Sequence, residues 1–315
     1  MTIVTENKDR PFVVMIGAAN MDICGVPSAT LIHKGSNPGT VSLSPGGVAR
    51  NIAENLARLG IDSRLIAAIG TDYFGKTLLR QGQHAGIDMS HIIELEDQQT
   101  SSYLSVLDDG GDLLVAINDM TIADQLTCEH IKKHHQILIE ASVIIVDTNI
   151  SEEIFAYLAD RYADQPIMVD TVSATKAVRI KPYLSSVHTL TANRMEAQAL
   201  CGINISLTEM AKWFHQQGVK RVFITLGPEG VFYSDENENG TLTVPKQANA
   251  ILNANGAGDA FMAGITYAWL QNWGLIKSTK FAMSAAHVTL AHIATINPEM
   301  SLKTVNKTLE TDYVN

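Results

Sequence analysis

One stretch, residues 251–264 with the sequence ILNANGAGDAFMAG, determines how the rest of this chain is interpreted. A glycine-rich turn, Gly256-Ala257-Gly258, leads directly into a segment whose apolar residues recur at helical spacing, so the turn is predicted to begin a helix. Backbone N–H groups in the first turn of a helix have no intrahelical partner, and glycine leaves them accessible. The stretch therefore predicts a cradle for an anion such as phosphate.

Asp259 lies in the same predicted first turn. The helix dipole there is expected to lower the pKa of its carboxyl group and keep it ionised, so that it can accept a proton or orient a hydroxyl. A carboxylate beside a cradle for negative charge suits the transfer of a phosphoryl group to an alcohol. The alternative is a glycine-rich loop in which Asp259 only stabilises the start of a helix.

Size and charge limit the classes of function. The chain has 315 residues, enough for one large α/β domain, and we expect residues 1–315 to form a single domain. Its formal charge of −10, without a run of Lys or Arg, argues against binding to nucleic acid or to anionic membranes. The expected partner is a small molecule.

The cysteine and histidine residues indicate a reducing cellular compartment and argue against a zinc enzyme. Cys24, Cys128 and Cys201 are far apart and form no C-x-x-C pair, which is typical of free thiols in a reducing compartment. The ten histidines show no spacing typical of a zinc site. No apolar stretch is long enough to span a bilayer, and we expect a cytoplasmic protein.

From about residue 130, short apolar strands alternate with helix-length segments. The predicted strands are residues 143–146, 167–169, 187–190 and 222–225. This alternation predicts βαβ units and hence an α/β fold with a mainly parallel sheet between helices. The carboxyl ends of parallel strands share one edge of the sheet, where we expect Asp147, Asn149, Asp170, Asn193 and Thr225.

The N-terminal part supplies more polar residues for the same edge. A predicted strand at residues 12–16 precedes Asn20 and Asp22, and the glycine pair Gly46-Gly47 opens a predicted helix that carries Asn51. Asp22 could bind two sugar hydroxyls, and the Asn51 amide could reach a ligand that lies on the glycine backbone. The alternatives are a turn capped by its own Asn and Asp side chains and a purely structural glycine turn.

Two segments interrupt the β/α alternation. Residues 24–45 are predicted to form short exposed strands, and residues 98–120 contain a hairpin around the sequence DDGGD. We expect both segments to form a small β-sheet lid beside the main sheet, which brings Asn118 and Asp119 close to the site. The open edges of such a sheet could pair with a second copy of the chain, giving a homodimer.

Two later motifs have both a chemical and a structural interpretation. Asn193 and Glu196 share one face at the start of a predicted helix, where their oxygen atoms could hold a hydrated Mg²⁺ ion. The same spacing is also a capping box. Gly227 and Gly230, which follow Thr225, allow close approach by a nucleotide or simply form a tight turn.

In their order along the chain, these motifs resemble those of the ribokinase-like (PfkB) carbohydrate kinase family, over about residues 12–294. The motifs are Asn20-x-Asp22, Gly46-Gly47-x-x-x-Asn51, Asn193-x-x-Glu196, Thr225-x-Gly227-x-x-Gly230 and Gly256-Ala257-Gly258-Asp259. The resemblance implies a three-layer α/β/α sandwich with a mainly parallel sheet and a small β-sheet lid. It also implies transfer of the γ-phosphoryl group of ATP, with Mg²⁺, to a hydroxyl.

The resemblance implies a role for each matched residue. Asp259 is expected to be the catalytic base, next to an anion hole formed by Gly256, Ala257 and Gly258. Asn193 and Glu196 are expected to hold Mg²⁺ through water. The implied sugar contacts are Asn20, Asp22, Gly46, Gly47 and Asn51. The implied nucleotide contacts are Asn193, Thr225, Gly227, Gly230 and Asn255.

Within the family, residues 45–53 and 115–120 are among the stretches most similar to the subgroup that phosphorylates pseudouridine. The implied acceptor is the 5′-hydroxyl of pseudouridine, the implied product is pseudouridine 5′-phosphate, and Asn118, Asp119 and Asn149 are the implied contacts to the base. Other interpretations are a kinase for another nucleoside, ribose or a related sugar, and a nucleoside-binding sensor without catalysis.

Two positions depart from the family pattern. Asn253 replaces an Asp that helps many relatives hold an activating K⁺ ion, and a neutral amide binds a cation less well, so dependence on K⁺ stays open. Thr171 stands where relatives often have Pro, which leaves Asp170 free to act near the phosphates. Lys176, just beyond, is expected to be a solvated side chain rather than a phosphate ligand.

Overall fold

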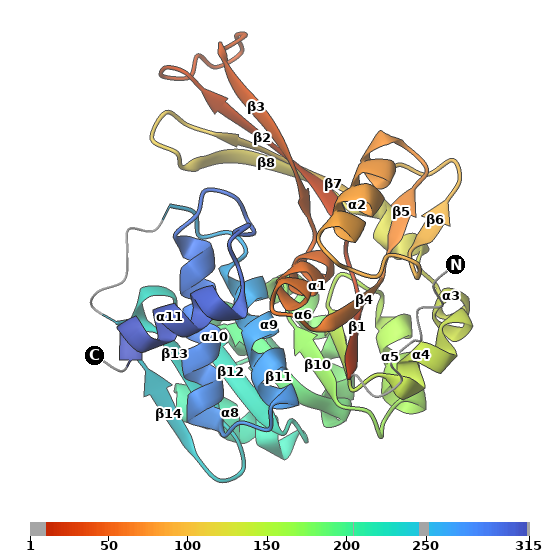
Figure 1. The fold of residues 1–315 in the computed structure, drawn as a ribbon, viewed down its shortest axis with the longest axis vertical. Coiled ribbons are helices and arrows are strands. Elements are labelled where there is room, and N and C mark those ends of the chain that lie inside the picture. Colours follow the sequence, from red (N-terminus) through yellow and green to blue (C-terminus); the bar gives the residue numbers. More distant parts are fainter. Residues whose placement is uncertain (1–10, 204, 246–251, 314–315) are drawn as a thin grey trace.

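An eight-stranded sheet forms the middle of the molecule (Figure 1). The computed structural model describes residues 11–203, 205–245 and 252–313. In spatial order the strands are β14 (Asn239–Leu242), β13 (Val231–Ser234), β12 (Arg221–Thr225), β11 (Val187–Asn193), β10 (Ile167–Asp170), β9 (Val143–Asp147), β1 (Phe12–Ile16) and β4 (Asp62–Ile66). The six strands β12, β11, β10, β9, β1 and β4 run parallel, whereas β13 pairs antiparallel with both β12 and β14. The predicted mainly parallel sheet is confirmed.

Helices cover both faces because successive strand residues are apolar on both sides of the sheet. Val14 and Val146 face a layer made of α3 (Cys128–Lys133), α4 (His135–Glu140), α5 (Glu152–Arg161), α6 (Ala174–Ala177), α7 (Arg194–Cys201) and α8 (Leu207–Gln216). Val13 and Met15 face the layer that contains α1 (Val48–Arg58), α2 (Tyr73–His84) and α9 (Ala257–Leu270). Helices α10 (Leu275–Leu290) and α11 (Leu302–Tyr313) extend that second layer. The three-layer α/β/α fold is therefore confirmed.

Short elements join these layers. They are the 3-10 helices η1 (Thr121–Gln125), η2 (Val178–Ser186) and η3 (Gly227–Glu229), and the parallel pair β5 (Ala68–Gly70) and β6 (Ile93–Leu95).

Cys24, Cys128 and Cys201 are free thiols, as predicted. Among the helices of the described ranges, none has the length and apolar character needed to cross a membrane.

A separate four-stranded sheet projects from the main body (Figure 1). Its order is β3 (Gly39–Gly46), β2 (Asn20–Pro27), β7 (Ser102–Leu107) and β8 (Leu113–Asp119). The β7–β8 pair is the predicted antiparallel hairpin, and Asp108 in its turn accepts hydrogen bonds from the backbone N–H groups of Gly110 and Asp112. Both segments predicted to form a lid contribute strands to this sheet, although β2 begins earlier, at Asn20.

The register of this lid sheet gives it one polar and one apolar face. Residues that pair across strands point to the same side, and neighbours along a strand point to opposite sides. The polar row consists of Ser44, Asp22, Tyr103 and Asn118. The adjacent row on the other face consists of Leu43, Ile23, Leu104 and Ile117.

Candidate active site

The glycine-rich turn begins helix α9, as predicted. Gly256 has φ of 80°, and a Cβ atom there would lie 2.1 Å from the Thr295 carbonyl oxygen, so only glycine fits. The first intrahelical hydrogen bond runs from Ala260 N to Gly256 O at 3.0 Å, which leaves the preceding N–H groups outside the helical ladder. A Cβ atom on Gly258 would meet nothing within 4 Å. The space in front of these donors is therefore open.

Asp259 lies in the first turn of α9 and is 9% exposed, and its Oδ2 accepts a 2.9 Å hydrogen bond from Asn51 Nδ2. Burial and the negative charge of Asp170 raise its pKa well above the usual range, while the Asn51 hydrogen bond acts in the opposite direction. The prediction of a lowered pKa was wrong, because desolvation and neighbouring carboxylates outweigh the helix dipole. A raised pKa makes the ionised group a stronger proton acceptor.

Asp22 and the glycine pair meet at the junction of the lid sheet and α1. Asn20 Nδ2 donates to Asp22 Oδ1 at 2.6 Å, and burial raises the pKa of Asp22. A Cβ atom on Gly46 would lie 2.4 Å from the Asp22 carboxylate. Gly47 has φ of 98°, and its Cβ atom would lie 2.4 Å from the Ala18 carbonyl oxygen. Both glycines therefore allow this junction to pack tightly beside the carboxylate.

Asp147 organises the same region, although sequence reasoning assigned it only a place at the sheet edge. It is fully buried, its Oδ2 accepts 2.9 Å hydrogen bonds from Ala18 N and Ala49 N, and its Oδ1 accepts one from Asn149 N at 2.8 Å. Burial raises its pKa. The carboxylate thus joins the end of β9 to the loop after β1 and to the first turn of α1. A Cβ atom on the adjacent Gly17 would lie 2.3 Å from its Cγ.

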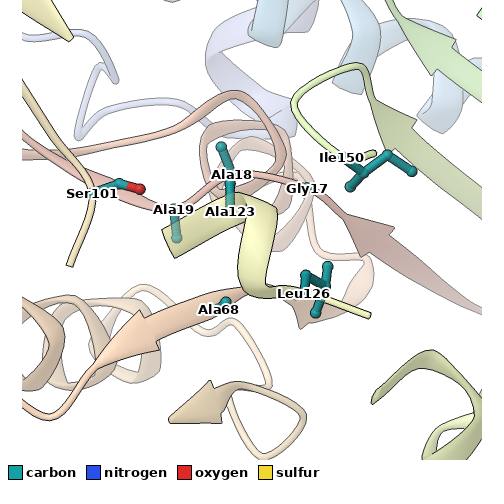
Figure 2. Close-up of a pocket in the computed structure, with 8 residues that line it drawn as sticks. All are labelled: Gly17, Ala18, Ala19, Ala68, Ser101, Ala123, Leu126 and Ile150. Atoms are coloured by element: carbon teal, nitrogen blue, oxygen red, sulfur yellow. The ribbon is translucent and has the colours of Figure 1, made fainter. Parts of the chain in front are cut away.

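The loop after β1 also borders a narrow crevice (Figure 2). The crevice has no room for a water molecule, so it is a packing seam rather than a ligand site. Its lining is mostly apolar and consists of Gly17, Ala18, Ala19, Ala68, Ser101, Ala123, Leu126 and Ile150.

Asn193 and Glu196 form the capping box that was the structural alternative for this motif. Asn193 Oδ1 accepts from Glu196 N at 2.9 Å, and Glu196 Oε2 accepts from Asn193 N at 2.8 Å. Thr171 Oγ1 also donates to Glu196 Oε2 at 2.6 Å. Burial and the charges of Glu196 and Asp147 raise the pKa of Asp170 to about 7. These carboxylates repel one another, and a bound divalent cation would relieve that repulsion.

The donor chemistry at this edge fits Mg²⁺ held through water. Within residues 11–203, 205–245 and 252–313, no three His, Cys, Asp or Glu side chains are grouped to hold a metal directly. Both carboxylate oxygens of Glu196 accept hydrogen bonds from the protein. Mg²⁺ keeps most of its waters and prefers oxygen ligands, so a hydrated ion suits these residues.

The two glycines after β12 differ in what they accommodate. Gly230 has φ of 110°, and its Cβ atom would lie 1.9 Å from Leu242 O, so it allows β14 to pack closely. Gly227 has φ of 59°, and its Cβ atom would meet nothing within 4 Å. Thr225 Oγ1 lies 3.5 Å from the Ala192 carbonyl oxygen. Of the two glycines, Gly227 leaves open space for a ligand.

Asn253 and Asn255 are joined within the loop that precedes α9. The Asn253 Oδ1 atom accepts from Asn255 N at 2.9 Å, and its Nδ2 donates to the Ile293 carbonyl oxygen at 2.8 Å. Asn255 is exposed. The Asn253 amide oxygen therefore holds its own loop, and its NH₂ group joins that loop to the one containing Ile293.

Strand alternation separates Asn118 and Asp119, which the sequence analysis placed together beside the site. Asn118 lies in the polar row of the lid sheet, whereas Asp119 lies on the opposite face and accepts hydrogen bonds from Thr121 N and Oγ1 at 3.1 and 2.8 Å. Ser44 and Tyr103 share the row of Asn118, and sequence reasoning missed both. Strict alternation within the predicted hairpin would have identified Tyr103.

Asn149 is buried, and its side chain contacts a basic group rather than solvent. Its Oδ1 accepts a 2.6 Å hydrogen bond from Lys176 Nζ. Arg179 Nη1 lies 3.1 to 3.3 Å from the carbonyl oxygens of residues 148–150. Lys176 is half-buried, and burial lowers its pKa. The expectation of a solvated Lys176 was therefore wrong, because the turn after β10 brings it against the end of β9.

Comparison with known proteins gives a consistent assignment. The profile of the pfkB family of carbohydrate kinases matches residues 10–302. A pseudouridine kinase from Escherichia coli is 40% identical over 307 residues, 96% of this chain and 98% of the relative. An uncharacterized sugar kinase of that organism is 35% identical and covers 95% and 83%. The crystal structure of a candidate sugar kinase from Clostridium perfringens has a TM-score of 0.86 at 33% identity, with 96% of each chain covered. This chain belongs to the pfkB family of carbohydrate kinases.

Proposed function

We propose that this chain transfers the γ-phosphoryl group of ATP to the 5′-hydroxyl of pseudouridine, giving pseudouridine 5′-phosphate. The observation that carries the proposal is the buried contact of Asp259 with Asn51 beside the glycine-rich turn of α9. As a pfkB carbohydrate kinase the chain uses ATP with Mg²⁺. The pseudouridine kinase of Escherichia coli, 40% identical over nearly the whole chain, supports the choice of substrate.

In this proposal Asp259 is the catalytic base. The 5′-oxygen attacks the γ-phosphorus while its proton passes to the Asp259 carboxylate, and ADP leaves with the electron pair of the broken P–O bond. The first-turn N–H groups of Gly258 and its neighbours stabilise the negative charge on the transferred group, and losing one such donor typically costs about 10²–10³-fold in rate. Bound Mg²⁺ would neutralise further charge, with Asn193 and Glu196 holding it through water.

The polar row of the lid sheet is proposed to contact the base. Pseudouridine is a C-glycoside, so its uracil ring carries one more N–H donor than the ring of uridine. Asn118 offers both an amide donor and an amide acceptor, and Tyr103 offers a hydroxyl that can do either. The ribose would lie against Asn20, Asp22 and the glycine pair. Asp119 points away from this row and is not a base contact in the proposal.

The test is ATP-dependent ADP release with Mg²⁺, measured on pseudouridine, uridine and ribose, with the product identified by mass spectrometry. We expect turnover on pseudouridine with a kcat/KM at least tenfold above that on uridine, the discrimination of about 1.4 kcal/mol that one hydrogen bond can supply. Turnover on uridine or ribose alone would contradict the substrate. Binding of pseudouridine without turnover of any compound would favour a nucleoside sensor.

The apolar face of the lid sheet is proposed to form a homodimer interface. Its exposed apolar side chains include Val41, Leu43, Val115 and Ile117, which are 73%, 55%, 52% and 63% exposed. A second copy of the chain offers the same apolar surface, and a two-fold contact would cover both. Multi-angle light scattering is expected to give a dimer for the wild type and a monomer for Ile117→Lys. A wild-type monomer at micromolar concentration would contradict the proposal.

A further inference from the structure

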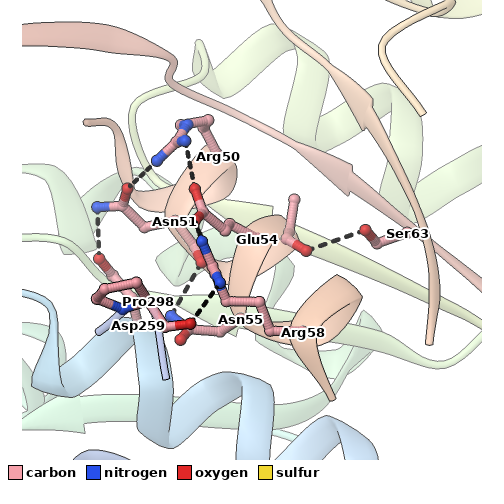
Figure 3. A network of polar contacts seen from close by, with 9 residues as sticks. Arg50, Asn51, Glu54, Asn55, Arg58, Ser63, Asp259 and Pro298 are labelled. Atoms are coloured by element: carbon pink, nitrogen blue, oxygen red, sulfur yellow. Dashed lines mark hydrogen bonds and ion pairs between the residues drawn. The ribbon is translucent and has the colours of Figure 1, made fainter. Parts of the chain in front are cut away.

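The Asn51 side chain lies between a guanidinium and a carboxylate (Figure 3). Its Oδ1 accepts a hydrogen bond from Arg50 Nη1 at 3.2 Å, and its Nδ2 donates to Asp259 Oδ2 at 2.9 Å. Arg50, Asn51 and Asp259 are 3%, 4% and 9% exposed. Water therefore has little access to these groups, and the orientation of each side chain depends on its contacts with the others.

The chemistry of the three groups allows only one orientation of the amide. A guanidinium carries donors only, and an ionised carboxylate accepts only. If the Asn51 amide were rotated by half a turn, its NH₂ group would face Arg50 and its oxygen would face Asp259. Both contacts would then be repulsive in a site with little water, where such contacts are most costly. Arg50 therefore holds the amide oxygen on its own side, which keeps the NH₂ group directed at Asp259.

A buried ion-pair network holds Arg50 in place (Figure 3). Its Nη2 pairs with Glu54 Oε2, and Glu54 Oε1 pairs with Arg58 Nη2 at 2.7 Å. Arg58 Nη1 also donates to the Pro298 carbonyl oxygen at 2.8 Å. Arg50, Glu54 and Arg58 are spaced four residues apart on α1, so they share one face of the helix. The network thus fixes the guanidinium through Nη2, while Nη1 contacts Asn51.

We propose that Arg50 is a positioning residue for phosphoryl transfer. It orients the Asn51 amide so that Nδ2 donates to Asp259 Oδ2, and this leaves Asp259 Oδ1 to accept the proton of the substrate hydroxyl. Nothing in the described part of the chain donates a hydrogen bond to that Oδ1. The inference rests on the proposed role of Asp259 as the base.

The inference predicts a change in the pH dependence of the rate. Asp259 faces the carboxylates of Asp170, Asp147 and Asp22, which raise its pKa, whereas the Asn51 hydrogen bond lowers it. If the amide is no longer oriented, that hydrogen bond is lost and the pKa of Asp259 rises further. The base acts in its ionised form, so the acidic limb of the kcat profile moves to higher pH.

An open cavity of about 530 Å³ beside Arg50 allows a second test. It lies among α1, α2, the lid strand β3 and residues 294–296. Removal of the Arg50 side chain would leave a hole that opens to this cavity, and a free guanidinium ion is small enough to enter it. Its lining consists of Ser44, Pro45, Arg50, Glu54, Arg58, Arg80, Gln81, His84, Ala85, Ala294, Thr295 and Ile296.

The experiment compares Arg50→Ala, Arg50→Lys and the control Arg58→Ala over a range of pH. Arg58 pairs with the same Glu54 carboxylate but does not contact Asn51, so its loss controls for the ion pair alone. We expect Arg50→Ala to lower kcat by about 10²-fold, as small misplacements of catalytic groups do, and to move the acidic limb upward. Millimolar guanidinium, but not sodium, should restore part of the rate. Arg58→Ala should leave the limb in place.

The outcomes separate this inference from the proposed function. Arg50→Lys keeps a charge beside Glu54 and is the variant to use if Arg50→Ala does not fold. It should also move the limb upward, because the single nitrogen of an ammonium cannot reproduce the fork in which Nη1 contacts Asn51 and Nη2 contacts Glu54. Wild-type kcat and pH limb in both Arg50 variants would overturn the inference and leave the base intact. A wild-type rate in Asp259→Asn would overturn the base and the inference together, and a wild type without turnover would overturn the proposed function.

Discussion

Replacement of Asp147 tests the account of how the site is held together. Its two carboxylate oxygens accept three backbone hydrogen bonds, from Ala18 N, Ala49 N and Asn149 N, at a position with no solvent exposure. Those three N–H groups belong to the loop after β1, the first turn of α1 and the loop after β9. The substitutions Asp147→Asn and Asp147→Ala remove different numbers of these acceptors.

The expected losses follow from the number of donors left without a partner. A buried N–H group that loses its acceptor costs about 1–3 kcal/mol. In Asp147→Asn the amide oxygen can still accept the hydrogen bonds from Ala18 N and Ala49 N, so only the Asn149 N–H group loses its acceptor. The free energy of unfolding should then fall by about 1–3 kcal/mol. In Asp147→Ala all three N–H groups lose their acceptor, and the free energy of unfolding should fall by roughly 3–9 kcal/mol, with water in the hole giving the lower value.

Urea unfolding followed by circular dichroism measures these losses. With an m value of about 3 kcal/mol/M, Asp147→Ala should lower the midpoint by roughly 1–3 M. Asp72 is the matched control, because its half-buried carboxylate accepts from Gly75 N at 2.8 Å and from Thr100 N and Oγ1 at 2.9 and 2.6 Å. Because Asp72 is an N-cap near solvent, Asp72→Ala should lower the free energy of unfolding by only about 1 kcal/mol. Equal losses at the two positions would refute the argument from burial.

Three further predictions concern the site. In Asp170→Asn the acidic limb of the kcat profile should move to lower pH, since the Asp170 charge helps raise the pKa of Asp259, and an unmoved limb would contradict that coupling. Asn118→Ala should raise the KM for pseudouridine about fivefold, the usual effect of losing one hydrogen bond, whereas Asp119→Ala on the other face of the lid should leave KM unchanged. Steady-state kinetics measures both, and equal effects of the two substitutions would contradict the assignment of Asn118 to the binding face. The rate of the wild type should not depend on KCl at constant ionic strength, because the neutral Asn253 amide already joins the loop before α9 to the loop containing Ile293. Asn253→Asp should make the rate depend on K⁺. Activation of the wild type by K⁺ would contradict this prediction.

The sheet and the meeting of polar strand ends could be predicted because they follow from local pattern. Short apolar strands that alternate with helices give a parallel sheet, and parallel strands bring their carboxyl ends to one edge. The mutual effects of Asp147, Asp170 and Asp259 on their pKa values reflect that common edge. The helix start at Gly256 and the capping box at Asn193 were also readable, since both depend on residues within one turn.

Features that depend on tertiary packing could not be predicted. The direction of the Asp259 pKa shift depends on burial and on carboxylates far away in the sequence, so the local dipole argument gave the wrong sign. The four-residue spacing of Arg50 and Glu54 predicts an ion pair, but its burial depends on elements distant in the sequence, among them α2, β3 and residues 294–296, which lie around the cavity beside the pair. Asn118 and Asp119 point to opposite faces because neighbours in a strand alternate, but strand register decides which of them shares a row with Tyr103, and a shift of one residue would exchange the two.

The most direct test of the central claim is a comparison of wild type and Asp259→Asn for both binding and turnover of pseudouridine. Calorimetry should give similar dissociation constants for the two proteins, because the amide keeps the shape of the side chain. With ATP and Mg²⁺, the wild type should form pseudouridine 5′-phosphate, and the variant should be slower by at least about 10²-fold, the usual contribution of a general base. Phosphorylation of pseudouridine by the variant at the wild-type rate would contradict the account.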